Sequence, residues 1–220
     1  LGKGMFIAVD KFTAVKICNK VKDHWKKEII NLVGHIGKTS DELLKEKLKI
    51  KLDYMRKVEM AVVISEEAGE EKKFEEQGLA IKPHRNKINA IDNEGHDIEY
   101  RFKAEKDPLQ LVFVCAMWLT GFDAPTVSTL YLDKPMKDHT LMQAIARANR
   151  VTSHTIYGKS KTNGEIVDYY NVFRNMKKAL ADYALGDEDK DEPPVRDKSE
   201  LFLLLDDAIE EDGRRVQRQQ

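Results

Sequence analysis

The sequence predicts an α/β fold with a mainly parallel sheet, because short apolar runs alternate with amphipathic segments along its 220 residues. Several of these runs are apolar throughout instead of alternating with polar residues, which is typical of strands covered on both faces. The segments between them repeat apolar side chains every three or four residues, as helices do when one side packs on a sheet. The length suits one large domain, or one domain with an appendage.

Composition narrows the class of protein further. Hydrophobic residues make up 41% and charged residues 34% of the chain, which is typical of a globular protein rich in surface ions. The net charge of -1 does not itself indicate nucleic-acid binding, although a basic cleft is compatible with a balanced total. Cys18 and Cys115 stand in apolar settings without metal spacing, so we interpret both as reduced and expect no metal site. No signal peptide and no membrane-length apolar run is visible, so we expect a cytoplasmic protein without membrane contact.

The first elements are a strand and a helix. Residues 4–9 predict a buried strand, and Asp10 can cap a helix from Lys11 to about Lys22. Residues 25–37 fit either a strand or a short helix. Gly37-Lys38-Thr39 resembles a phosphate loop, but Leu32 stands where that motif requires glycine, so a plain loop is favoured.

The next stretch mixes clear and unclear signals. A capping box at 39–42 predicts a helix over 41–57, and an apolar run predicts a strand over 58–65. The acidic segment 66–77 holds Glu70-Glu71-Lys72, half of a nuclease motif, but no aspartate on a neighbouring strand accompanies it, so a solvated helix face is favoured. Residues 78–99 are polar and predict a surface excursion anchored by Tyr100 and Phe102.

The chemistry is expected between residues 111 and 150. An apolar run over 111–118 predicts a central strand, and ligands of open α/β sheets bind at the carboxyl ends of such strands. Gly121 follows that strand and lets the backbone approach a ligand closely, while Asp123 can accept from a ribose hydroxyl or hold an arginine. A second apolar run over 127–132 follows; taken alone, this pattern is also that of an ordinary crossover with a turn glycine.

A helix with two arginines follows the second run, and Asp138 or Thr140 can cap it. Gln143, Arg147 and Arg150 are spaced four and three residues apart, so they share one stripe. Two arginines on one stripe repel unless an anion or carboxylates stand between them, and arginine forks suit phosphate oxygens. The alternative is a solvated basic stripe. The small residues Ala144, Ala146 and Ala148 allow this helix to pack closely against a neighbouring element. This favours a phosphate site over the solvated stripe.

The remaining residues predict a polar loop over 153–163, a strand over 165–169 and an amphipathic helix over 171–185. We therefore expect one domain over 1–186. Residues 187–197 are charged and contain prolines, which indicates a linker, and 198–220 predict the start of a helical element that frays at its end.

The motifs of the central stretch resemble those of a known family. Thr-Gly-Phe-Asp-Ala-Pro at 120–125 and Gln-Ala-Ile-Ala-Arg-Ala-Asn-Arg at 143–150 resemble motifs V and VI of superfamily 2 helicases and translocases. YLDKP lies between these two motifs and GEIVDYYNVF follows them. Together these segments are similar in sequence to the motor (R, restriction) subunit of type I restriction enzymes. The resemblance covers 4–185, which would be the second RecA-like motor domain, and the helical element predicted over 198–220 would be a C-terminal appendage to it. Ala146 departs from the glycine that many superfamily members have there.

This resemblance implies roles for individual residues. Arg147 and Arg150 would be the catalytic arginine-finger candidates, reaching ATP and its Mg²⁺ held mainly by a first motor domain of the same polypeptide. Gln143, Gly121 and Asp123 would lie on the nucleotide side, and Thr120 would touch the nucleic-acid backbone. The implied partners are that first RecA-like domain, double-stranded DNA, and the methyltransferase and specificity subunits of a restriction complex.

What the sequence lacks also bears on function. It contains no Walker A motif, no acidic Walker B strand and no nuclease constellation, and it opens on Leu1 without Met, so we expect a piece of a larger enzyme that is inactive alone. Two other hypotheses stay open: the motor domain of a superfamily 2 repair helicase, and a RecA-like scaffold that binds without catalysis.

Overall fold

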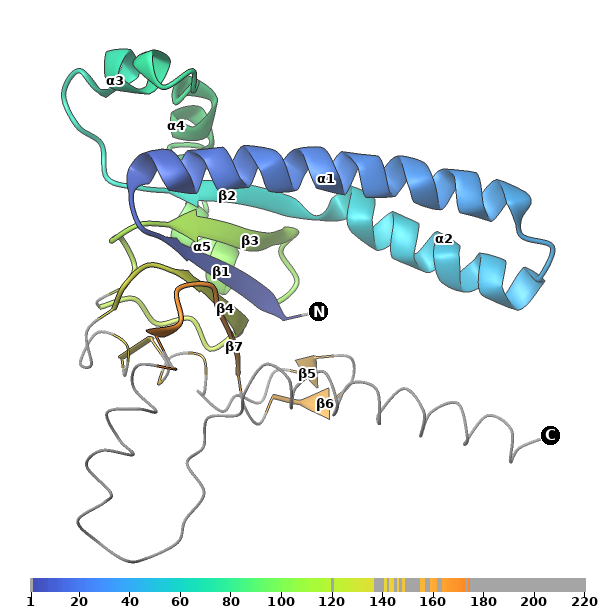
Figure 1. Ribbon diagram of the computed structural model, residues 1–220. Coiled ribbons are helices and arrows are strands. Elements are labelled where there is room, and N and C mark those ends of the chain that lie inside the picture. The colour runs from blue at the N-terminus through green and yellow to red at the C-terminus, as the bar shows by residue number, and fades with distance from the viewer. Residues whose placement is uncertain are drawn as a thin grey trace, which may run out of the picture. The chain divides into compact units, whose positions relative to one another are not determined.

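A five-stranded, all-parallel sheet forms the centre of the protein (Figure 1). The computed structural model describes residues 2–119, 121–136 and 164–172, together with 141, 143, 144, 146, 148, 155, 156, 159–161 and 174. The strand order is β2-β3-β1-β4-β7, with the bounds β1 (Lys3–Ala8), β2 (Glu59–Val63), β3 (Leu109–Val114), β4 (Val127–Asp133) and β7 (Glu165–Asp168). Each of these five strands was predicted, four of them as apolar runs, and the sheet confirms the RecA-like α/β class. The run at 111–118 was predicted too long, because β3 ends at Val114.

Helices connect the strands: α1 (Lys11–Lys38), α2 (Glu42–Lys57), α3 (Glu70–Glu76), α4 (Lys82–Ile88) and α5 (Ile98–Lys103). Two short strands, β5 (Thr155–Ile156) and β6 (Lys159–Ser160), pair antiparallel within the segment predicted as a polar loop, so that prediction was wrong there.

The chain divides into two compact units, 1–170 and 171–220. In the second unit the structure describes only Asn171, Val172 and Arg174, and the last two are helical. Most of the helix predicted over 171–185 lies outside the described residues, as do the whole linker and the C-terminal helical appendage.

The middle strand β1 is buried on both faces, as its unbroken apolar run predicts. It pairs with β3 on one side and β4 on the other, which places Phe6 opposite Phe113 and Tyr131. Phe6 and Ala8 pack in the core that α1 covers, whereas Met5 and Ile7 face the other side of the sheet.

Helix α1 runs unbroken for 28 residues, so ending it near Lys22 and treating 25–37 as a separate element was wrong. Its start is as predicted, since the Asp10 carboxylate accepts from the Thr13 amide at 2.7 Å. Ile29, Leu32 and Ile36 continue the three-four spacing of Trp25 and pack against α2, whereas Ile30 and Val33 are exposed. A side chain at Gly34 would meet nothing within 4 Å, so this glycine lies on the open side and interrupts no contact.

Helix α2 returns antiparallel along α1 to form a hairpin whose far half extends beyond the sheet (Figure 1). Asp41 caps α2 by accepting from the amides of Leu43 and Leu44, which agrees with the predicted start of the helix. The predicted capping box was wrong in its residue, because Thr39 ends α1 instead. The indole Nε1 of Trp25 donates to the Met55 carbonyl at 2.8 Å, joining the two helices where α2 ends. Only Leu32, Leu52 and Met55 are buried in the hairpin's own apolar cluster.

The segment predicted as a polar surface excursion contains α4 and leads into α5, so it was wrong to expect irregular structure throughout. Of the two expected anchors, Phe102 is fully buried under the sheet. Tyr100 is 53% exposed and stacks on His96, so it does not anchor the segment to the core.

Candidate functional site

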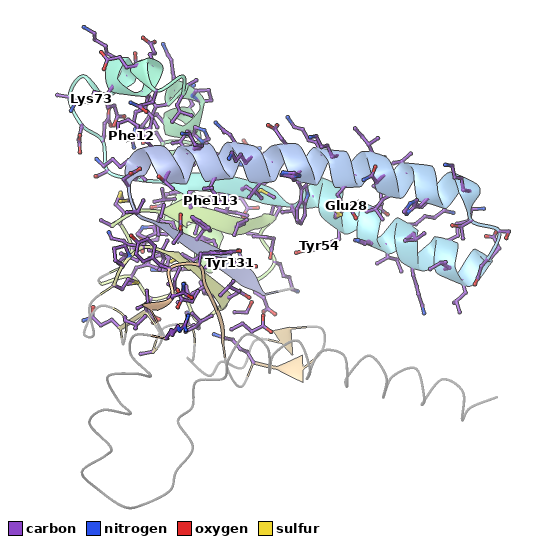
Figure 2. All side chains as sticks on the ribbon, viewed as in Figure 1. Phe12, Glu28, Tyr54, Lys73, Phe113 and Tyr131 are labelled. Atoms are coloured by element: carbon purple, nitrogen blue, oxygen red, sulfur yellow. The ribbon has the colours of Figure 1, made fainter. Side chains whose placement is uncertain are left out.

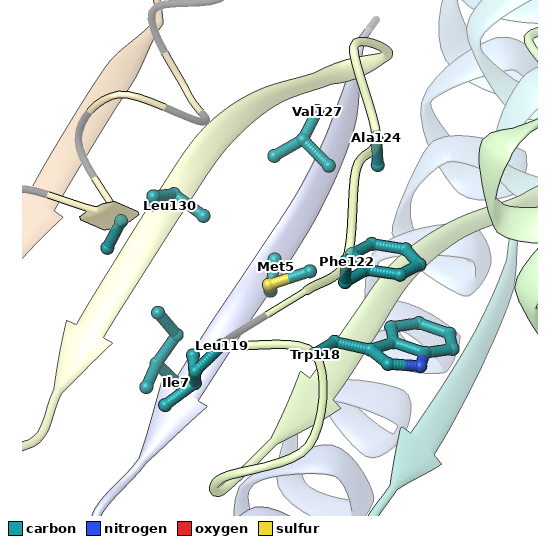
Figure 3. Close-up of a pocket in the computed structure, with 9 residues that line it drawn as sticks. Met5, Ile7, Trp118, Leu119, Phe122, Ala124, Val127 and Leu130 are labelled. Atoms are coloured by element: carbon teal, nitrogen blue, oxygen red, sulfur yellow. The ribbon is translucent and has the colours of Figure 1, made fainter. Parts of the chain in front are cut away.

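The loop after β3 folds back over the sheet face that carries Met5 and Ile7 (Figure 3). Trp118 and Phe122 stack in this loop with their ring centroids 4.3 Å apart and their planes 3° apart. Phe102 of α5 extends the stack, 5.7 Å from Trp118. Between loop and sheet lies a small apolar pocket lined by Met5, Ile7, Trp118, Leu119, Phe122, Ala124, Val127, Leu130 and Ala144. The aromatic stack therefore holds the loop against the sheet.

The backbone of this loop takes two left-handed turns. Trp118 has a φ of 65° and Gly121 a φ of 72°. A side chain at Gly121 would therefore be strained even though nothing lies within 4 Å of its position. Gly121 and Asp123 are exposed, while Phe122 and Ala124 on alternate positions are buried. Thr120, the third residue predicted in this loop, lies outside the described residues.

Hydrogen bonds fix the end of the loop to three separate segments. The Lys3 amide donates to the Thr126 carbonyl at 3.1 Å, and the Thr126 hydroxyl donates to the Phe102 carbonyl at 3.4 Å. The Lys161 ammonium donates to the Pro125 carbonyl at 3.1 Å, and burial lowers the pKa of this lysine. Sequence reasoning missed Lys161, because a lysine in a polar stretch carries no local signal of burial.

A second buried lysine ties the start of β1 to α5. The Lys3 ammonium donates to the Arg101 carbonyl at 2.9 Å and lies 5.5 Å from the centre of the Phe102 ring. Burial lowers the pKa of Lys3 to about 8. The same phenylalanine that supports Trp118 thus also supports the first strand.

The helical segment after β4 lies on the same face of the sheet as the loop. Leu141, Ala144 and Ala148 are buried, Gln143 is half-buried and Ala146 is exposed. The predicted packing of this helix through small residues is confirmed at Ala144, which lines the pocket together with Phe122. The structure thus brings the Gly121 loop and the Gln143 helix together. Arg147 and Arg150, and the candidate caps Asp138 and Thr140, lie outside the described residues.

Gly164, just before β7, touches the backbone of this helical segment. A side chain added there would overlap the Ala148 carbonyl and lie 2.7 Å from the Ala148 Cβ. A backbone group cannot give way as a flexible side chain can, so only glycine fits at this contact. Nothing in the sequence around Gly164 pointed to it, because the contact joins segments that are distant along the chain.

Glu70, which belongs to the half-motif of a nuclease, is a structural residue. Its carboxylate is buried and accepts from the Arg85 Nη2 at 2.7 Å, and hydrogen bonding to that guanidinium lowers the pKa of Glu70. Arg85 also donates to the carbonyls of Ile64 and Ser65 at the end of β2. The predicted solvated face was therefore wrong at Glu70. In the part of the chain that the structure describes, no group of His, Cys, Asp or Glu side chains could hold a metal ion.

These features define a RecA-like α/β domain with a glycine-containing strand-end loop and a small-residue helix on one face of the sheet. Residues 27–171 match the family described as type I restriction enzyme subunit R domain 3. The chain belongs to this family.

Individual relatives carry corresponding names. The type I restriction enzyme HindI endonuclease subunit of Haemophilus influenzae is 53% identical over 102 residues, which are 46% of this chain and 9% of that protein. A Methanocaldococcus jannaschii protein named as the MjaVIIP endonuclease subunit is 30% identical over 210 residues, 92% of this chain and 18% of that protein. The chain therefore spans less than a fifth of the length of either relative.

A solved structure described as a fragment of a type I restriction enzyme HsdR subunit from Vibrio vulnificus covers 89% of this chain, with 15% identity and a TM-score of 0.41. The chain covers 27% of that structure. No helix among the described residues of the present protein is long and apolar enough to cross a membrane.

Proposed function

We propose that this chain is the second motor domain of an ATP-dependent translocase of double-stranded DNA, within a type I restriction enzyme R subunit. In this proposal Arg147 and Arg150 act on ATP that a first motor domain of the same subunit holds. The proposal rests on the family to which the chain belongs and on the relatives that are named endonuclease subunits.

The observation that carries the proposal is the shared pocket of the loop and the helix. Phe122 and Ala144 line it together, so the two segments that hold the motif-like residues meet on one face of the sheet. Gln143, Arg147 and Arg150 are spaced to share one stripe, and the buried Leu141, Ala144 and Ala148 form another. A helix seated through small side chains holds its polar stripe at a fixed distance from the sheet, as phosphate recognition requires.

The proposed chemistry is divided between two domains. ATP with Mg²⁺ supplies the phosphoryl group, and the first domain holds most of it. From this chain, the arginine guanidinium groups neutralise charge that develops on the phosphate oxygens, which contributes about 10³ to 10⁵ in rate in related NTPases. Gln143 assists at the phosphates, and Asp123 accepts from the ribose, while Gly121 lets the loop backbone come close. Thr120 contacts the DNA backbone.

The decisive experiment uses the complete R subunit assembled with the methyltransferase and specificity subunits. Arg147→Ala and Arg150→Ala are made separately, and DNA-stimulated ATP turnover is measured. At least one variant is expected to lose about a thousandfold in turnover. Arg174→Ala, an exposed arginine further along the chain, is the matched control and should turn over normally.

Three results would go against the proposal. Normal turnover in both arginine variants would remove the motor assignment and leave a binding scaffold. Strand separation in place of translocation would favour a repair helicase. A Gly164→Ala variant adds a third criterion, because its new methyl group must displace the backbone at Ala148. Gly164→Ala should lower ATP turnover although residue 164 does not contact the nucleotide. Normal turnover in this variant would show that the packing of the helix at Ala148 does not affect catalysis.

A further inference from the structure

The hairpin of α1 and α2 is strongly basic although the whole chain is not. Residues 11–57 hold 13 lysines and arginines against 6 aspartates and glutamates, a net charge of +7, while the whole chain has a net charge of -1. The structure describes all of these residues. At about 1.5 Å per residue, α1 alone extends roughly 40 Å, so much of this charge is carried well away from the site described above.

One side of the seam between the two helices carries more cations than the other. Its two helices meet through Trp25, Leu32 and Ile36 of α1 and through Leu48, Leu52 and Met55 of α2. The ion pair between Lys51 and Glu28, 3.3 Å apart, marks one side of this seam (Figure 2, where Glu28 is labelled).

At about 100° per residue, Lys26 of α1 and Lys45, Lys49 and Arg56 of α2 fall on the opposite side of the seam. We call these four residues the basic face. Its Lys26, Lys49 and Arg56 are exposed, and Lys45 is half-exposed. Lys45 pairs with Glu42 at the margin of the face.

The side marked by Lys51 and Glu28 carries fewer cations. There Lys47 and Lys51 are accompanied by Glu28. Beside the seam the basic face therefore holds four cations against two on the other side, with Glu42 and Asp53 at its outer margin. Like charges on adjacent turns repel each other slightly, so the basic face costs a little stability when nothing negative covers it.

The exposed apolar side chains of the hairpin do not argue for a protein partner. Ile30, Val33, Leu43, Leu44 and Ile50 are each at least 46% exposed. On the helical wheels they point in different directions, and of these five only Val33 lies on the side of the basic face. Scattered exposed apolar residues are normal on a protein surface, whereas a docking surface for a protein gathers them in one patch.

We propose that the basic face of the α1–α2 hairpin binds the phosphate backbone of duplex DNA, as a contact separate from the loop and helix of the motor site. This inference rests on the proposed translocase function. From Lys45 to Arg56 the face extends about 16 Å along α2, a length over which one DNA strand presents on the order of five phosphates.

The composition of the face favours the backbone of a duplex over a single strand. Lysine and arginine contact phosphates without reading sequence, which suits an enzyme that moves along DNA. Proteins that hold single strands add aromatic side chains on which bases stack. The basic face has none, because the aromatic side chains of the hairpin lie elsewhere: Trp25 is in the helix–helix seam and Phe12 packs on Phe74.

The test compares two triple variants of the 220-residue chain that change charge equally. K26Q/K49Q/R56Q removes three charges from the basic face, and K27Q/K47Q/K51Q removes three from other sides of the same two helices. All six positions are exposed, so both variants should fold, which circular dichroism checks. Binding to a 30-base-pair duplex and to one of its single strands is measured without ATP at several salt concentrations.

For the wild-type chain we expect salt-dependent duplex binding that exceeds single-strand binding. Removing three phosphate contacts should reduce the slope of log affinity against log salt by about 2.7 and weaken binding at 0.1 M salt by on the order of a hundredfold. The control variant should keep the wild-type slope, apart from a small general charge effect.

Four outcomes overturn the inference: no duplex binding by the wild-type chain, equal losses in the two variants, an unchanged slope in K26Q/K49Q/R56Q, or preference for the single strand. Because no ATP is present, these results do not depend on Arg147 or Arg150. Failure of this inference is therefore distinguishable from failure of the motor assignment, which is judged by ATP turnover.

Discussion

The sheet and the α1–α2 hairpin are stabilised in different ways, although α1 belongs to both. In the sheet, β1 and β3 are buried on two faces, and Phe113 and Val114 have no exposed surface. The hairpin has three buried apolar residues in its own cluster, and residues 11–57 carry a net charge of +7. Regions with few buried contacts open locally at low free energy. The comparison indicates that the sheet is rigid and positions the loop and helix of the candidate site. The α1–α2 hairpin is stable mainly where it joins the sheet.

The largest expected effect tests this contrast directly. Phe113→Ala should lower the free energy of unfolding by about 4 kcal/mol, since the cavity in the sheet core cannot collapse. Leu52→Ala in the hairpin should cost about 2 kcal/mol, because neighbouring side chains there can relax towards solvent. Urea denaturation of both variants measures the two values, and equal losses would show that the hairpin is packed as firmly as the sheet.

A pair of carboxylates gives the next comparison. Glu70 is buried beside Arg85, so Glu70→Gln leaves the guanidinium charge without its partner and should cost about 3 kcal/mol. Unfolding free energy measured at pH 7 checks this, with Glu71→Gln, an exposed residue on the same helix, as the control. A loss as small as that of the control would mean that Arg85 finds other acceptors.

The junction of α4 with the sheet should respond to pH. His84 is buried, and this burial lowers its pKa to about 4. Between pH 6.5 and 4 the unfolded chain holds a proton on this imidazole that the folded chain does not, so folding stability falls as the pH falls. Relative to His84→Gln, the wild type should lose about 2 kcal/mol between pH 7 and 4.5. A difference that stays constant with pH would contradict the burial of a neutral histidine.

The smallest effect is expected in the hairpin. Glu28 and Lys51 are 3.3 Å apart, and both side chains are about half exposed. Because water screens such a pair, Glu28→Gln should change the unfolding free energy by less than about 0.5 kcal/mol. A loss close to that of Glu70→Gln would remove the distinction between the two regions.

The sheet was predictable from sequence because burial on both faces leaves a local trace. The runs at 4–9 and 111–118 contain scarcely a polar residue, and β1 and β3 lie within or beside them. Helix starts were predictable for a similar reason, since Asp10 and Asp41 satisfy amides a few residues away. The length of α1 was not predictable from sequence. An apolar pair such as Ile29-Ile30 fits a strand as well as a helix until the partner helix is known.

In the candidate site, too, residues with a local sequence signal were predictable and residues defined by long-range contacts were not. Gly121 lies in the loop after an apolar strand, as predicted, whereas its left-handed backbone was not predicted and its ligand role stays a prediction. Lys161 and Gly164 were missed because their roles consist of contacts with Pro125 and Ala148, which are distant in sequence. Gln143 and Asp123 are present on the expected segments, and their roles stay predictions, as do those of Thr120, Arg147 and Arg150.

The chain has two tryptophans, one in the α1–α2 hairpin and one in the loop over the sheet. Each is an intrinsic fluorophore for its region. Trp25 sits in the seam of the hairpin with its indole nitrogen on the Met55 carbonyl. Trp118 lies flat against Phe122 over the sheet. In a chain that keeps only Trp25, emission would follow the separation of the two helices; in one that keeps only Trp118, it would follow the lifting of the loop. Fluorescence of these two single-tryptophan chains then reports on the hairpin and on the loop separately.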